Sequence, residues 1–158
     1  MTNMSDAYML RLFADLRSQI LEVVVSAEGQ LHRIPNGFRN HLYWQIGHVL
    51  TVTDELIYGL TGEGSRIPPV YRKYFAPGTV PVQGQEQLPP AEVLIKQLQQ
   101  QQLDISEMDA SRMEQPVPDS DNFLHASKTR ELFYVLIAHE GTHVGMIHAM
   151  VKVLARSH

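Results

Sequence analysis

The chain contains no cysteine. Disulfide bonds, thiolate metal ligands and a cysteine nucleophile are therefore excluded. It also lacks the run of roughly 18 apolar residues that suggests a membrane-spanning helix, and its lysines and arginines form no basic cluster of the kind that binds nucleic acid. Charged residues interrupt the apolar pattern of the N-terminal segment, which does not resemble a signal peptide. We therefore expect a cytoplasmic protein with neither a membrane nor a nucleic acid as partner.

The composition is that of a folded globular protein. The chain has 158 residues, of which 44% are hydrophobic and 19% charged, with a net charge of −4. This length suits one domain spanning residues 1–158, with enough chain to bury a core. Eight histidines are many for such a chain.

Apolar residues recur at helical spacing along most of the chain. In the first segment they are spaced alternately four and three residues apart, at Met9, Phe13, Leu16, Ile20 and Val23. No stretch alternates with the period of two that a strand requires. Helices are predicted over residues 5–28, from just after Gly37 to about 60, from about 90 to 113, and over 127–154. Four long amphipathic helices predict an all-α fold, a four-helix bundle.

A long connection is predicted between the second and third of these helices. Residues 62–88 are rich in glycine and proline, which interrupt regular structure. Within them, residues 70–75 (VYRKYF) suggest one short helical turn. Neither side of this segment has enough helices for a core of its own, so we interpret it as a crossover within one domain.

The strongest chemical signal lies in the fourth helix, where His139 and His143 are four residues apart. This spacing places both imidazoles on one helix face, within reach of a single metal ion. They fill a gap in an apolar row made up of Leu132, Leu136, Met146, Met150 and Val153. We therefore predict that both face the core. Two unpaired buried rings would each cost about 1–3 kcal/mol, and a shared metal ion satisfies both.

The same stretch, His-Glu-x-x-His, is also a metalloprotease motif. Position 149 is alanine where one protease class needs a third histidine, and no carboxylate follows His143. A ferritin-like di-iron site requires two Glu-x-x-His motifs, and Glu140 with His143 forms only one. Neither reading therefore fits the whole sequence.

A third ligand must come from another helix. The candidates are His41 and His48, which lie seven residues apart and hence on one side of the second helix. Both lie at the edge of its apolar face. The pattern alone does not choose between them.

Two stretches resemble the signature regions of a known family. Residues 40–50 (NHLYWQIGHVL) and 139–147 (HEGTHVGMI) are similar to those of the DinB/YfiT-like superfamily, and they occur in the corresponding helices. The resemblance implies a four-helix bundle, often a homodimer, with a metal site of three histidines. Carried over by position, the ligands are His48, His139 and His143, whereas His41 receives no role.

The resemblance also implies candidate activities. Known activities of the family include thiol S-transfer with bacillithiol or related small thiols, and a mycothiol-dependent isomerase. Our first hypothesis is therefore a transferase that uses one divalent ion, zinc or nickel or else iron, and an external thiol. A second is a hydrolase that uses a metal-bound water, with Glu140 as base. A third is a non-enzymatic binding bundle, whose ion is closed off by His41 or Glu140. The sequence leaves open whether the protein is an enzyme.

Overall fold

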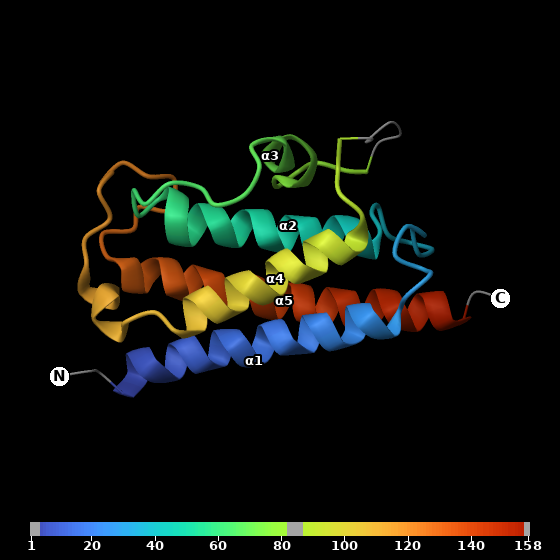
Figure 1. Ribbon diagram of the computed structural model, residues 1–158, viewed down its shortest axis with the longest axis horizontal. Helices are drawn as coiled ribbons and strands as arrows, with labels where there is room; N and C mark the ends of the chain where they lie inside the picture. Colours follow the sequence, from blue (N-terminus) through green and yellow to red (C-terminus); the bar gives the residue numbers. More distant parts are fainter. Residues whose placement is uncertain (1–3, 82–86, 157–158) are drawn as a thin grey trace.

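The computed structural model describes residues 4–81 and 87–156, and the helices in it account for all regular structure of these residues. Their order along the chain is α1 (Met4–Ser26), α2 (Leu42–Asp54), α3 (Val70–Phe75), α4 (Ala91–Ser106) and α5 (Thr129–Arg156). The four longer helices run alongside one another, and the short α3 lies over α2 (Figure 1). The predicted all-α bundle is thus confirmed. Within the described residues, each helix is too short or too polar to cross a lipid bilayer.

The buried face of α1 differs from the predicted face at two positions, where the buried residue comes one position later in the sequence than predicted. Phe13, Ile20 and Val24 are buried as a core row requires, but the residue between Phe13 and Ile20 in this row is Arg17, not Leu16. Arg17 is completely buried. A core row predicted from apolar residues cannot include a charged residue such as Arg17. Burial of a charge requires a partner, and the local sequence does not reveal this partner. That partner is on α5.

The second helix begins later than predicted. The sequence suggested a start just after Gly37, whereas α2 starts at Leu42. His41 has extended backbone angles, and its Nδ1 accepts a hydrogen bond from the backbone N–H of Trp44 at 3.0 Å. It therefore caps the helix in the manner of an N-cap aspartate or serine. At its other end α2 continues into a π-helix (Glu55–Gly59), a feature that often occurs at functional sites.

The connection between α2 and α4 packs against α2 through a short helix. The predicted helical turn of residues 70–75 is confirmed as α3, which buries Tyr71 and Phe75 against the core. A Cβ atom on Gly47 would overlap the Phe75 ring. Glycine at this position thus permits the close approach of α3 to α2. Residues 82–86 of the predicted connection lie outside the described residues.

The third long helix ends earlier than predicted. It was expected to reach about Met113, but α4 ends at Ser106 and is followed by a short 3₁₀ helix (Ala110–Glu114). The Asp109 side chain accepts a hydrogen bond from the backbone N–H of Ser111 at 2.9 Å, which starts the new helix. Met113 is nevertheless buried in the core. The apolar pattern of α4 thus continues into the 3₁₀ helix, although the α-helix itself does not.

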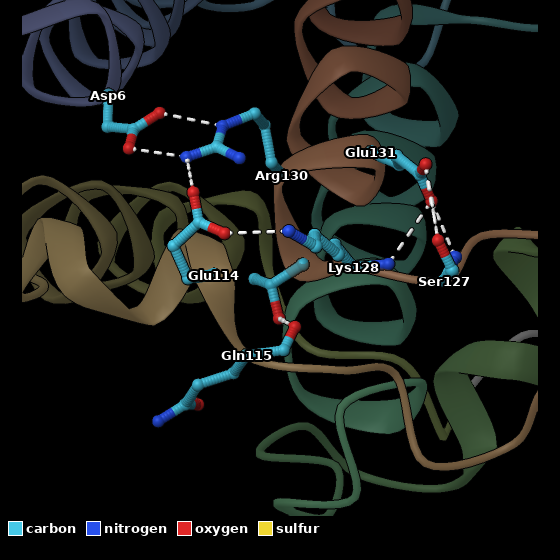
Figure 2. A network of polar contacts seen from close by, with 8 residues as sticks. Asp6, Glu114, Gln115, Ser127, Lys128, Arg130 and Glu131 are labelled. Carbon is cyan, nitrogen blue, oxygen red and sulfur yellow. Dashed lines mark hydrogen bonds and ion pairs between the residues drawn. The ribbon is translucent and has the colours of Figure 1, made fainter. Parts of the chain in front are cut away.

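Charged residues join the ends of three elements at one end of the bundle (Figure 2). Arg130, near the start of α5, contacts Asp6 of α1 through Nη2 at 2.8 Å and Glu114 of the 3₁₀ helix at 2.5 Å. Glu114 also contacts Lys128 at 2.8 Å. These partners lower the pKa of Glu114 to about 2. The network fixes how α1, the 3₁₀ helix and α5 meet.

Candidate metal centre

Three histidines from two helices meet inside the bundle. His48 lies on α2, and His139 and His143 lie one turn apart on α5. Each histidine offers one ring nitrogen, and these three nitrogens all lie within 4.8 Å of one another. His48 and His143 are buried, and His139 is half-buried. The structure thus brings together the three residues expected from sequence and resemblance.

Two of the rings are oriented by hydrogen bonds on the side away from the cluster. His48 Nδ1 lies 2.7 Å from the carbonyl oxygen of Phe75, which can only accept. His143 Nδ1 lies 2.6 Å from the side-chain oxygen of Gln45. Gln45 in turn donates from its amide nitrogen to Asn40 at 2.8 Å, which fixes the direction of its oxygen. Each Nδ1 therefore carries the proton, and each Nε2 is free to bind a metal, the arrangement usual for metal-binding histidines.

His48 Nε2 and His139 Nε2 lie only 3.1 Å apart. If both rings carry their proton on Nδ1, two lone pairs face each other, and a cation between the rings relieves the repulsion. His139 Nδ1 is buried and has no hydrogen-bond partner among the described residues. A metal-free pair can instead share a proton between the two Nε2 atoms. In either state His139 Nδ1 has no partner among the described residues, so it is the facing Nε2 atoms that favour a bound cation. The donor set therefore fits a divalent ion of the kind imidazole prefers.

The site favours neutral imidazoles. Burial, followed by the neighbouring His143 and His48, lowers the pKa of His139 to about 3. Burial and the neighbouring His48 lower the pKa of His143 to about 4. Burial also lowers the pKa of His48, although its hydrogen bond to Phe75 opposes the shift. Near neutral pH all three rings have the lone pairs that metal binding requires.

Aromatic packing holds His48 in place. The Trp44 ring stacks on the His48 ring, with centroids 4.6 Å apart and planes 11° from parallel. Trp44 itself donates through its indole N–H to the carbonyl of Tyr74 at 3.1 Å. The close approach of α3 at Gly47 brings the Phe75 carbonyl within reach of His48. The segment before His48 is thus built to orient this ring.

Glu140 lies on the same buried row of α5 as His143 and pairs with Arg17. Its Oε1 accepts from Arg17 Nε at 2.5 Å, and its Oε2 accepts from Arg17 Nη2 at 3.3 Å. Both side chains are completely buried. The core row of α5 runs through Leu136, Glu140, His143 and Ile147. The prediction that His143 faces the core is therefore confirmed, while Glu140 takes the position on this row that we had expected for His139.

His41 is not part of the three-histidine cluster. Besides capping α2, its ring contacts His32 and Tyr43, with centroids 5.4 and 5.9 Å away. Burial and the neighbouring His32 lower the pKa of His41 to about 4. The sequence pattern could not choose between His41 and His48. The structure places His48, not His41, beside the pair on α5.

A pocket of about 570 Å³ opens beside the cluster and includes all three histidines in its lining. The rest of its wall comes from α2, the π-helix, the α3 region, α5 and the loop before α5. Sequence reasoning missed these wall residues and also Gln45. Gln45 lies within residues 40–50. A single polar residue in an apolar helix gives no sign, in the sequence, that its side chain orients a histidine on another helix.

Comparison with known proteins supports the resemblance stated from the motifs. A comparison with curated proteins finds no significant match. A family model described as the DinB superfamily matches residues 8–147, which include both histidine-bearing helices and the connection between them. Because the match covers most of the chain and the three histidines meet in one cluster, the protein belongs to the DinB superfamily.

Proposed function

We propose that the protein binds one divalent metal ion through His48, His139 and His143 and uses it to transfer a small thiol to an electrophile. The observation that carries this proposal is the open arrangement of the cluster. Three histidines offer three potential ligands and border a pocket of about 570 Å³. In zinc proteins, three protein ligands with a free position are typical of catalytic sites, whereas structural sites are closed by four.

The chemistry of thiol transfer suits this arrangement. A divalent cation stabilises a thiolate, the reactive form of a thiol, near neutral pH. The chain has no cysteine, so a thiol substrate must come from outside. The roles of the protein's own residues are to hold the ion through the three Nε2 atoms, to keep the rings neutral, and to keep water from the buried side of the cluster. Zinc or nickel is the proposed metal, with iron as an alternative.

An assay of electrophile consumption tests the thiol hypothesis. Metal-loaded protein is incubated with an electrophile and, in turn, with bacillithiol, mycothiol, glutathione or coenzyme A. We expect one thiol to be consumed faster than without protein, and His139→Ala to abolish the difference. If no thiol is used by protein of verified metal content, the transferase proposal is wrong.

The hydrolase alternative depends on a base near the ion. Glu140 was predicted for this role, but its carboxylate is engaged with Arg17 and does not line the pocket. A Glu140→Gln variant addresses it directly. Retention of metal and of any hydrolytic activity would exclude Glu140 as the base. Loss of activity with metal and fold retained would support it.

A closed structural site is the non-enzymatic alternative. It would require His41 or Glu140 as a fourth ligand, and each has another partner in the structure. Thermal melting with and without a chelator bears on this alternative, since a structural ion stabilises the fold strongly. Homodimerisation, a small-molecule partner and cytoplasmic location stay predictions.

A further inference from the structure

The pocket beside the histidines is largely apolar. Its wall includes Val52, Leu56, Pro77, Phe123, Leu124 and Val135. Its volume of about 570 Å³ is in the range typical of small-molecule sites. Val135 lies one helical turn before His139 on α5, so the apolar wall begins next to the cluster.

The charged groups of the pocket neutralise each other. Glu55 Oε2 accepts from Arg72 Nη2 at 2.6 Å, and both side chains remain partly exposed. Together these two side chains carry no net charge. A ligand that carries a net charge would therefore lose part of its hydration without meeting a net counter-charge on the pocket's acidic and basic side chains.

Phe123 gives the pocket an exposed aromatic edge. Its side chain is 69% exposed, yet the loop that carries it is held firmly by Asn122. The amide nitrogen of Asn122 donates to the carbonyls of Asp119 at 2.7 Å and Ala126 at 2.8 Å. Its amide oxygen accepts from the backbone N–H groups of Leu124 and Ala126. Phe123 is thus held at the pocket's edge while most of its ring remains uncovered.

We propose that this pocket binds a neutral, largely apolar, ring-containing small molecule, whose body lies between Val135 and Phe123 and whose reactive group reaches the histidines. Because this molecule would be the substrate of the metal centre, the inference rests on the proposed function. Its physical basis is separate, because burial of apolar surface in the pocket does not require the metal. An aromatic ligand would also stack on the Phe123 ring.

The test is a fluorescence titration with N-phenyl-1-naphthylamine, a neutral aromatic probe, on metal-free and zinc-loaded full-length protein. We expect saturable binding of one probe per chain in the metal-free protein. Val135→Asp places a charge in the apolar wall and should weaken binding about tenfold or more. Val93→Asp is the matched control, because Val93 is 38% exposed against 36% for Val135 but lies on α4, outside the pocket. It should leave binding unchanged.

A second pair of variants keeps the test independent of the new charge. Phe123→Ala should weaken probe binding about threefold to tenfold through loss of ring stacking. Leu103→Ala, an exposed apolar residue on α4 outside the pocket, should have no effect. Circular dichroism verifies that each variant is folded.

Three results would overturn the inference. They are the absence of probe binding to the parent, equal binding by parent and Val135→Asp, and a parent dimer that Val135→Asp converts to monomer. The last would mean that a second copy of the chain covers this face. Failure of the proposed function gives a different pattern, with a parent that takes up no metal or uses no thiol but still binds the probe.

Discussion

Among single residues, Arg17 and Glu140 stand out because they form an ion pair in which both side chains are completely buried. Arg17 also donates to the carbonyl of Leu98 and to the side-chain oxygen of Gln101, at 3.1 and 3.0 Å, so its guanidinium links α1 to both α4 and α5. A buried pair satisfied in this way contributes little net stability compared with apolar side chains, but loss of one partner leaves a buried charge alone.

Glu140→Gln is therefore expected to lower the free energy of unfolding by about 3–5 kcal/mol, since it leaves Arg17 without its counter-charge. The double variant Arg17→Met/Glu140→Leu should recover most of this loss. Urea unfolding followed by circular dichroism measures both. A Glu140→Gln variant as stable as the parent would show that the pair is not the anchor between α1 and α5.

The site could be predicted from the sequence only in part. The spacing of His139 and His143 indicated the metal-binding pair, and family resemblance selected His48 over His41. The pairing of Arg17 with Glu140 joins residues 123 positions apart, and no local pattern reveals such a contact. For the same reason, the predicted core row of α1 ran through Leu16 instead of Arg17, and that of α5 ran through His139 instead of Glu140.

Between elements, the decisive contact is that of α3 with α2. Gly47→Ala would place a methyl group against the Phe75 ring. We expect it to lower the free energy of unfolding by about 1–3 kcal/mol through overpacking. It should also weaken metal binding, because Phe75 must move and its carbonyl orients His48.

The control for this variant is Gly145→Ala on α5, where an added Cβ meets nothing within 4 Å. In a helix interior the change from glycine to alanine is favourable by about 0.8–1 kcal/mol. Chemical denaturation and zinc titration of both variants distinguish the two cases. Equal stability and equal zinc affinity in Gly47→Ala and the parent would contradict the proposed role of this glycine.

The helices themselves were predicted better than their ends. Apolar periodicity indicated all four long helices and the turn at 70–75. It did not indicate that His41 caps α2, since histidine is not a usual N-cap residue, nor that Asp109 restarts the chain as a 3₁₀ helix. Side chains that cap or break helices act through single hydrogen bonds, which a pattern of hydrophobicity does not record.

For the whole molecule, burial of neutral histidines links stability to pH. In the metal-free protein, the pKa of His143 falls to about 4 and that of His139 to about 3, from 6.5. Between these values the unfolded chain binds more protons than the folded one, so acid favours unfolding. The contribution of these two neutral rings to the free energy of unfolding is therefore fully present above pH 6.5. It decreases as the pH falls toward 4 and then 3.

Urea unfolding of metal-free protein at a series of pH values tests this link. We expect the free energy of unfolding to decrease from pH 7 to pH 4.5, and to decrease less in a His139→Ala variant. A parent with constant stability over this interval would show that the histidines titrate normally in the folded state.

We propose that His48, His139 and His143 together hold one metal ion. The most direct test of this proposal is elemental mass spectrometry on untagged protein, beside folded His48→Ala and His139→Ala variants. We expect close to one zinc, nickel or iron ion per chain in the parent and its loss in both variants. A folded, metal-free parent that takes up none of these metals would contradict it, and the three histidines would then be paired core residues.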